Sequence, residues 1–420
     1  MQMVMDRAQA QRHTVRTLML TQVLGGVGLA AGATVGSLLA ERISGRTDLA
    51  GLGGTFQTLG SALLALPIAA VAHRLGRRPS LTMAYVVAAL GALGIVTASA
   101  ISSFALFLLG SALLGSATAA NSGARYAAAD LALPERRGRD LSLVVWVTTV
   151  GSVFGPNLAG PAAPLARTLG LEVLAGPFVI STVTLTLAGL VMTWLLRPDP
   201  LLLSRTLAGE EYEHQKGSVG RGFAAIRRHP AAALGIGVMA LAHVVMVGVM
   251  VMTPIHLVHG HASLAVVGFV ISGHILGMFA FAPVMGWGVD RYGAPPVALT
   301  GGLILGVAAI LAGLSEAGFS ALLTVALFLL GLGWSAAFVS GSTLLVGPLT
   351  VAERPGGQGL ADLLMGLTAA AGGVVAGIVV QHWGYAWLAH IALTGAAAIM
   401  ILAAMALSAE RGAGAGRTVD

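Results

Sequence analysis

The segment Gly286-Trp287-Gly288-Val289-Asp290-Arg291-Tyr292-Gly293 decides the fold, because it interrupts a long apolar region and has a counterpart earlier in the chain. That counterpart, His73-Arg74-Leu75-Gly76-Arg77-Arg78, lies 217 residues before it. A second charged motif, Glu135-Arg136-Arg137-Gly138, recurs as Glu353-Arg354-Pro355-Gly356 after 218 residues. Two motifs that recur at nearly the same offset indicate that the chain is an internal duplication.

The composition places this duplicated chain in a membrane. Hydrophobic residues make up 56% of the 420 residues, charged residues only 10%, and the mean hydropathy is +0.87. Soluble domains have roughly a quarter of their residues charged, so these charges are too few to cover a soluble surface. Apolar stretches of about 20 residues, long enough to cross a bilayer, recur along the chain. We expect an all-α membrane protein with about twelve transmembrane helices, near 17–40, 50–72, 80–99, 104–128, 141–162, 174–196, 231–255, 263–286, 296–315, 318–346, 360–381 and 386–408.

The longest polar interruption runs from Arg197 to Pro230 and separates six expected spans from six. It divides the chain into an N-terminal half (1–196), a cytoplasmic central loop (197–230) and a C-terminal half (231–420). Nineteen of the 23 Lys and Arg residues fall in segments on the same side as both termini. Because basic loops stay in the cytoplasm, we expect both termini there. Paired halves of this kind are typical of secondary transporters.

Residues and motifs that the chain lacks disfavour several classes of function. It contains no cysteine, which excludes disulfides, thiolate metal sites and cysteine nucleophiles. It has no phosphate-binding loop and no nucleophile motif, so we expect neither an enzyme nor a permanently bound cofactor. Basic cytoplasmic loops explain the net charge of +6, so we expect a lipid bilayer and no nucleic acid as partner.

The duplicated segment resembles the signature of the major facilitator superfamily, roughly G-x-x-x-D-R-x-G-R-[RK] between spans two and three. The resemblance covers essentially the whole chain and implies two pseudo-symmetric six-helix halves that work by alternating access. The second copy fits well, whereas the first has Ala69 and His73 in place of the glycine and the aspartate. In the family that aspartate caps the start of helix eleven, near which this chain has Asp362. We hypothesise that Asp362 supplies the missing negative charge and pairs with His73.

The same resemblance implies gating roles for charged residues at the helix ends. Asp130, at the end of span four, is expected to pair with Arg77 or Arg137 as a gate latch. Arg125, in the same span, is interpreted as a latch with Asp130 or as a side chain that snorkels to the membrane surface, with substrate contact as the weaker alternative. The expected gating residues are His73, Arg74, Arg77, Asp130, Asp290, Arg291 and Asp362.

Span five carries Gly151, Gly155, Pro156 and Gly160 in a motif similar to one that is common in proton-coupled drug antiporters of the superfamily. Glycines allow close approach of helices, and a proline bends its helix. The motif therefore predicts tight packing around span five, and it does not fix the direction of transport.

Span seven carries a stripe of methionine and histidine. At about 100° per residue, Met239, His243, Met246 and Met250 fall on one narrow face, with His243 near the middle of the span. Methionine stripes are more often packing than ligands. Histidines inside a bilayer are different, because ionisable groups there are rare and usually functional.

Span eight repeats the pattern with His274 near its middle and Met278 one turn away. Thioether sulfur and neutral imidazole suit copper ions. Met246-Val247-Gly248-Val249-Met250 and His274-Ile275-Leu276-Gly277-Met278 resemble the M-x-x-x-M and H-x-x-x-M pair of the CcoA-type copper importers. That resemblance implies Met246, Met250, His274 and Met278 as metal ligands, and the helical face adds His243 and Met239.

The resulting expectation is import of copper across a bacterial cytoplasmic membrane for the assembly of cbb3-type cytochrome c oxidase. A copper ion is then the transported substrate, and a cytoplasmic copper acceptor is a possible partner. The main alternative is a proton-coupled exporter of drugs or small metabolites, which the motif of span five favours. A membrane receptor or sensor without transport is a second alternative. Asn121 is a further candidate to line the cavity, and Gln22 is expected to hydrogen-bond between helices.

Overall fold

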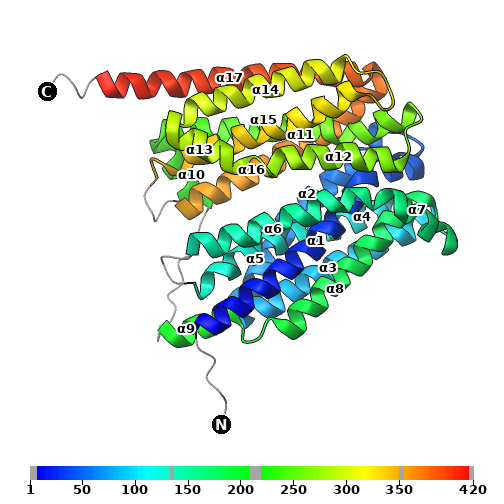
Figure 1. The fold of residues 1–420 in the computed structure, drawn as a ribbon, viewed down its shortest axis with the longest axis horizontal. Coiled ribbons are helices and arrows are strands. Elements are labelled where there is room, and N and C mark those ends of the chain that lie inside the picture. Colours follow the sequence, from blue (N-terminus) through cyan, green and yellow to red (C-terminus); the bar gives the residue numbers. More distant parts are fainter. Residues whose placement is uncertain (1–6, 133–136, 209–218, 350–353, 416–420) are drawn as a thin grey trace, which may run out of the picture. The chain divides into compact units, whose positions relative to one another are not determined.

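The computed structural model describes residues 7–132, 137–208, 219–349 and 354–415, and the regular structure within these ranges is entirely helical (Figure 1). Eleven helical segments in the described residues are long and apolar enough to cross a membrane. This confirms the all-α, multi-spanning fold class. The expected fifth span, 141–162, is occupied by α6 (Arg137–Asn157) and the start of α7 (Ala159–Thr168), which are not among these eleven.

Contacts between helices divide the chain into two compact units. Unit 1 comprises Met1–Arg46, Leu52–His214 and Ser263–Ser272. The predicted boundaries of the halves, at residues 196 and 231, stay a prediction. The other elements of unit 1 are α1 (Arg7–Ser44), α2 (Leu52–Leu75), α3 (Arg77–Ala100), α4 (Phe104–Leu114), α5 (Ser116–Asp130), η2 (Val173–Ala175), α8 (Gly176–Leu195), α9 (Pro200–Ala208) and the first part of α12 (Leu264–Phe279).

Unit 2 comprises Thr47–Gly51, Gln215–Ala262 and Gly273–Asp420. It contains η1 (Thr47–Leu49), α10 (Val219–Arg228), α11 (Pro230–His259), the end of α12, α13 (Ala282–Tyr292), α14 (Ala294–Gly313), α15 (Ala321–Val346), α16 (Arg354–Trp383) and α17 (Tyr385–Ala415).

The duplicated motif forms the same turn in both units. Gly76 lies between α2 and α3, with a φ of 97°, and Gly293 lies between α13 and α14, with a φ of 88°. Glycine is the residue that adopts positive φ without steric cost. The shared glycine of the two motif copies therefore has a structural reason, since each copy reverses the chain between two helices.

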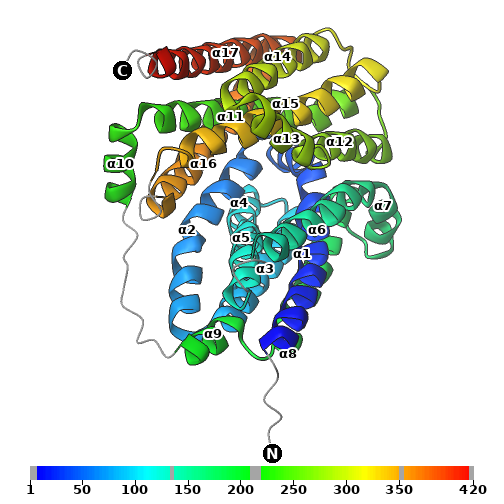
Figure 2. The ribbon, with the colours of Figure 1, turned by 60° about the vertical axis from the view of Figure 1, so that its left-hand side comes forward.

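Gly151 and Gly155 of the span-five motif pack against α1, which lies beside α6 in unit 1 (Figure 2), whereas Gly160 faces Ala265 of α12. A β-carbon at Gly151 would meet the carbonyl oxygen of Val23, and one at Gly155 would lie 2.8 Å from the β-carbon of Ala30. Neither position has room for a side chain. The motif thus brings the backbones of α1 and α6 close together, as expected for small residues at a membrane helix interface.

We predict that Gly151→Ala lowers the melting temperature of the purified protein in detergent, because the added methyl group overpacks the α1–α6 contact at a cost of about 1–3 kcal/mol. Gly36→Ala is the matched control, since a β-carbon at Gly36 in α1 would meet nothing within 4 Å. Equal melting temperatures for the two variants would contradict the role of Gly151 in close packing.

Candidate functional site

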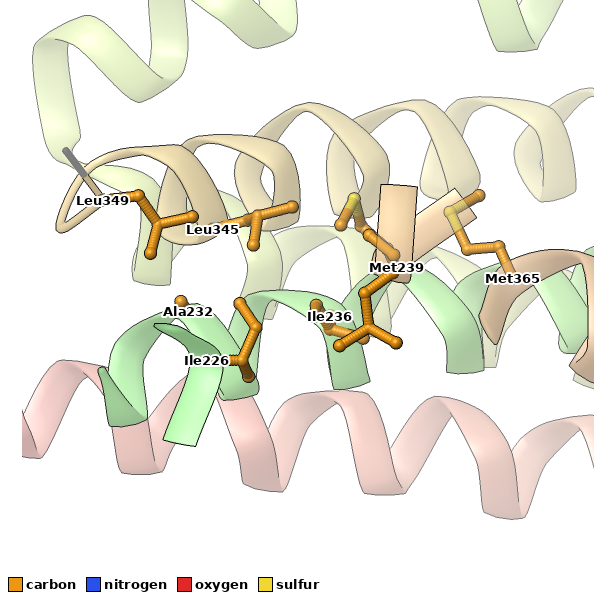
Figure 3. Packing of buried hydrophobic residues seen from close by; sticks show 9 residues of the cluster. Ile226, Ala232, Ile236, Met239, Leu345, Leu349 and Met365 are labelled. Carbon is orange, nitrogen blue, oxygen red and sulfur yellow. The ribbon is translucent and has the colours of Figure 1, made fainter. Parts of the chain in front are cut away.

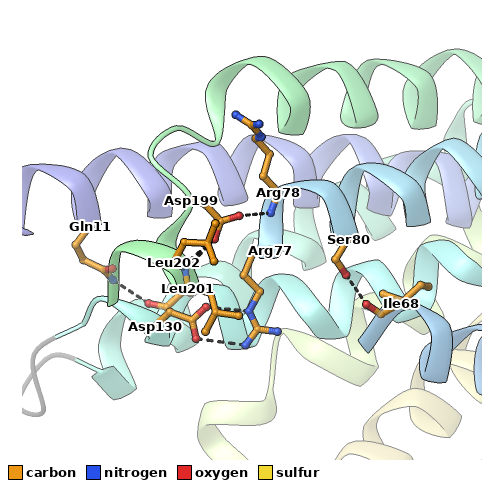
Figure 4. A network of polar contacts seen from close by, with 10 residues as sticks. Gln11, Ile68, Arg77, Arg78, Ser80, Asp130, Asp199, Leu201 and Leu202 are labelled. Atoms are coloured by element: carbon orange, nitrogen blue, oxygen red, sulfur yellow. Dashed lines mark hydrogen bonds and ion pairs between the residues drawn. The ribbon is translucent and has the colours of Figure 1, made fainter. Parts of the chain in front are cut away.

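An ion pair joins two helices at one end of unit 1. The guanidinium of Arg77 donates to both oxygens of Asp130, from Nε at 2.8 Å and from Nη2 at 3.3 Å (Figure 4). The two side chains are 20% and 13% exposed. Of the two partners expected for Asp130, Arg77 is the one found here, and the side chain of Arg137 lies outside the described residues. A two-pronged, partly buried pair is stronger than an exposed one. Its role as a gate latch stays a prediction.

Asp199 holds the same region together, although no sequence motif pointed to it. One oxygen accepts a hydrogen bond from the backbone N–H of Arg78 at 2.7 Å, and the other accepts from Leu201 and Leu202. These N–H groups belong to the first turns of α3 and α9. Backbone N–H groups in a first turn have no hydrogen-bond partner within their own helix. One carboxylate therefore caps two helices at once (Figure 4).

The remaining charged residues of the expected gating set lie at the surface. Arg74, Asp290, Arg291 and Asp362 are exposed. The side chain of His73 lies outside the described residues, so its hypothesised pairing with Asp362 stays a prediction. The gating roles of these five residues stay predictions as well.

A buried polar cluster lies in the interior of unit 1, where four helices meet. Tyr85 of α3 donates from its hydroxyl to Asn121 Oδ1 of α5 at 3.1 Å and to Gln22 Oε1 of α1 at 3.4 Å. The amide nitrogen of Gln22 donates to the hydroxyl of Thr148 in α6 at 2.9 Å. This confirms that Gln22 bonds between helices. The amide nitrogen of Asn121 forms no hydrogen bond among the described residues, which leaves a donor for another molecule.

Arg125 does not form the latch that the sequence suggested. Both oxygens of Asp130 already accept from Arg77, and Arg125 instead donates from Nη2 to the hydroxyl of Ser122 at 2.8 Å. The expected Arg125–Asp130 pair is therefore wrong. The partner of Asp130 is Arg77, which comes from another helix, α3.

In unit 2, Met239 belongs to an apolar cluster rather than to an open path. It is 3% exposed and packs among residues of α10, α11, α15 and α16, including Ile236, Leu345 and Met365 (Figure 3). Its sulfur also accepts a hydrogen bond from the hydroxyl of Ser342 at 3.2 Å. The geometry of Met239 suits packing.

His243 has an aromatic partner that the sequence did not reveal. The indole nitrogen of Trp334 donates to Nδ1 of His243 at 3.1 Å, so this ring nitrogen accepts and the proton lies on Nε2. Trp334 also stacks on Phe338, with the ring centroids 4.8 Å apart, and meets Phe279 edge-on at 6.0 Å. His243 is therefore one member of an aromatic group.

His274 is fully buried, and its two ring nitrogens have different environments. Nδ1 lies 2.8 Å from the carbonyl oxygen of Leu327, to which it donates. Nε2 has no hydrogen-bond partner among the described residues. Met246 and Met278 are buried, and Met250 is half-buried. The described residues contain no group of three or more His, Asp or Glu side chains that could hold a metal ion.

The long apolar helices and the duplicated turns define a polytopic membrane protein whose organisation is typical of transporters. A family model described as Major Facilitator Superfamily matches residues 18–265 and 238–418. The chain therefore belongs to the Major Facilitator Superfamily.

The proteins similar to this chain do not share one stated substrate. The chain is 37% identical over 405 residues to the uncharacterized MFS-type transporter YdeG of Bacillus subtilis, covering 95% of this chain and 93% of that one. It is 29% identical over 392 residues to the riboflavin transporter RfnT of Brucella anthropi, covering 91% and 92%. A bacterial homologue of the human lysosomal transporter Spinster, solved in an inward-facing and unoccupied conformation, has a similar fold, with a TM-score of 0.67, 16% identity and coverage of 94% and 95%. These proteins do not support the assignment to CcoA-type importers, which stays a proposal.

We predict that the Arg77–Asp130 pair can be reversed. Asp130→Arg alone should lower the melting temperature because two cations then face each other. Adding Arg77→Asp should restore stability, with a coupling free energy between the two positions on the order of 1 kcal/mol. The control adds Arg78→Asp instead, because Arg78 contributes its backbone N–H to the bond with Asp199 and not its side chain. Equal recovery with Arg78→Asp would argue against a specific pair.

Proposed function

We propose that the protein is a secondary transporter of a small polar organic solute, moved by alternating access across a bacterial cytoplasmic membrane with both termini in the cytoplasm. The observation that carries the proposal is the polar cluster of Gln22, Tyr85, Asn121 and Thr148. Such a solute fits the small-metabolite alternative that the motif of span five favours. It leaves the direction of transport open.

The chemistry of this cluster suits an organic solute. Polar groups inside a membrane protein are costly unless they are hydrogen-bonded, and here each of four helices contributes one. The free amide donor of Asn121 adjoins the hydroxyl of Tyr85, which is fully buried and already donates to Asn121 and Gln22, so the cluster offers one free donor that Tyr85 holds in place. Hydroxyl, carbonyl and ring-nitrogen groups of a solute can accept a hydrogen bond from this donor. Hard or soft metal ions do not, because an amide N–H is no metal ligand.

One relative points the same way. RfnT of Brucella anthropi is described as a riboflavin transporter, and the match to it spans nearly the whole of both chains. Riboflavin is a ring system with several hydroxyl groups. We take from this the class of solute and not riboflavin itself.

We predict that cells producing the protein differ from cells producing Asn121→Ala in the level of at least one small organic metabolite. Asn121→Ala removes the free donor, and Tyr85→Phe removes the adjoining hydroxyl while keeping the ring. Each should lower transport of that metabolite about tenfold, the scale of one lost hydrogen bond in a buried site. The measurement is mass spectrometry of cells and medium, with labelled riboflavin as the first defined probe.

Thr97→Ala is the matched control, because Thr97 lies at the far end of α3 and its hydroxyl bonds only within that helix. Production and membrane insertion of each variant are checked by fluorescence-detected chromatography. Metabolite profiles identical for the wild type, Asn121→Ala and the empty vector would overturn the proposal.

Copper import is the second candidate, and one observation favours it. Nε2 of His274 is a buried lone pair without a described partner, and such groups usually have a reason. Met278 lies one turn further along the same helix. Against copper, Met239 packs in an apolar cluster and Nδ1 of His243 is taken by Trp334.

Copper-64 uptake separates the two candidates. Copper transport requires uptake above the empty vector that collapses in His274→Ala/Met278→Ala and in Met246→Ala/Met250→Ala, with Asn121→Ala unaffected. Transport of an organic solute requires copper-64 uptake no higher than in the empty vector. It also requires solute transport that falls in Asn121→Ala and not in the two variants of the copper ligands. If copper were the cargo, a cytoplasmic copper acceptor would be the expected partner.

A further inference from the structure

One face of α5 carries three polar side chains. Thr118 and Arg125 are exposed and Ser122 is half-exposed. Positions 118, 122 and 125 follow the spacing of a single helix face. The opposite side of α5 is lined by buried alanines, and its packing neighbours within unit 1 are mainly α1, α2, α3 and α6.

This face does not have the composition of a surface against lipid. Helix α5 contains no Leu, Ile, Val, Phe, Met or Trp, and Tyr126 is its one aromatic residue. The exposed side of α3 has the opposite character, with Val86, Leu90 and Leu93. Charged residues inside membrane segments almost always face the interior of the bundle or a water-filled cavity. The face of Thr118, Ser122 and Arg125 thus has the properties of a wall of an aqueous pathway.

The direction of the Arg125 side chain argues against snorkelling. A snorkelling arginine extends toward the nearer helix end, which here is Asp130. The guanidinium instead donates to Ser122, which lies one turn further from that end. The helix end already has its own cationic partners, since Arg7 donates to the carbonyl oxygen of Leu131 and Arg77 pairs with Asp130.

The positive charge of Arg125 is not neutralised within the described residues, where its only hydrogen bond goes to the uncharged hydroxyl of Ser122. The planar guanidinium has five donors, which match a carboxylate or a phosphate with two parallel hydrogen bonds. Asn121, whose amide nitrogen is free, lies one turn away on the same helix.

We propose that Arg125 binds an anionic group, a carboxylate or a phosphate, of the transported solute. This inference rests on the proposed function and narrows it, from a polar organic solute to an organic anion. Asn121, which Tyr85 holds in place, then binds the uncharged part of the solute, while Arg125 binds its charge.

The chain has no native cysteine, so single cysteines can test this inference before the solute is identified. Thr118→Cys reports whether the face meets water, and Leu90→Cys on the apolar face of α3 is the control. Purified protein in lipid nanodiscs, open to reagent from both membrane faces, is treated with anionic sulfonatoethyl or cationic trimethylammonioethyl methanethiosulfonate. Each reagent forms a mixed disulfide with the thiolate and releases methanesulfinate, and intact-mass spectrometry gives the rate.

We expect Thr118→Cys to react at least tenfold faster than Leu90→Cys. Asn121→Cys, one turn from Arg125, should prefer the anionic reagent. Adding Arg125→Gln should reduce the ratio of anionic to cationic rates about tenfold, and adding Arg125→Lys should largely preserve it. These results would support an anion-binding face.

Two results would overturn the inference, and each has a separate meaning. Equal, slow reaction at Thr118→Cys and Leu90→Cys would place the face against lipid, where a lipid headgroup is the only anion in reach. Fast reaction with no dependence on Arg125 would leave a water-lined face without an anion site. Neither result depends on which solute is moved, so transport of an uncharged organic solute can still hold when this inference fails.

Discussion

A hydrogen-bonding group inside a lipid-embedded helix has no water to bind, so its partner must come from the protein or from what the protein carries. The interior of unit 1 follows this constraint. Gln22, Tyr85, Asn121 and Thr148 come from four helices and bond to one another. Such contacts require backbones to approach closely, which Gly151 permits between α1 and α6.

The same constraint separates groups that complete the fold from groups that remain available. Both carboxylate oxygens of Asp130 accept from Arg77, and both of Asp199 accept from backbone N–H groups, so these contacts act as structural elements of the helix ends. Asn121 and Arg125 keep unused donors among the described residues, and Nε2 of His274 keeps an unused lone pair. Available groups of this kind in an apolar setting are the natural candidates for substrate contact.

The fold could be predicted from the sequence because bilayer thickness fixes the length of an apolar helix, and the duplicated motif marks equivalent turns at Gly76 and Gly293. The finer divisions could not be predicted. The expected span 104–128 is two helices that meet at Gly115, and the expected span 263–286 is divided between α12 and α13. Hydropathy does not detect these breaks, because α5 and α13 are less apolar than α4 and α12 but each pair, averaged together, is still apolar enough to read as one span.

The candidate site was harder to predict, because its partners are distant in sequence. Helical spacing places Met239 and His243 on one face of their helix, but it cannot show that Ser342 and Trp334 are their partners. It also cannot show that Arg77 takes both oxygens of Asp130 and leaves Arg125 to Ser122. Short motifs with two fixed residues, such as M-x-x-x-M, occur in packing as well as in metal sites, and the relatives do not favour copper. Tyr85 was missed because a single tyrosine in a span has no periodicity.

The central claim is that this chain carries an organic solute, and solute counterflow in liposomes with the purified protein as the only protein tests it most directly. Liposomes are preloaded with the unlabelled metabolite found in cells, and labelled metabolite or copper-64 is added outside. The account predicts a transient overshoot of the labelled metabolite that Asn121→Ala abolishes, with no protein-dependent movement of copper-64. Accumulation of copper-64 that requires His274 and Met278, without exchange of any organic solute, would contradict it.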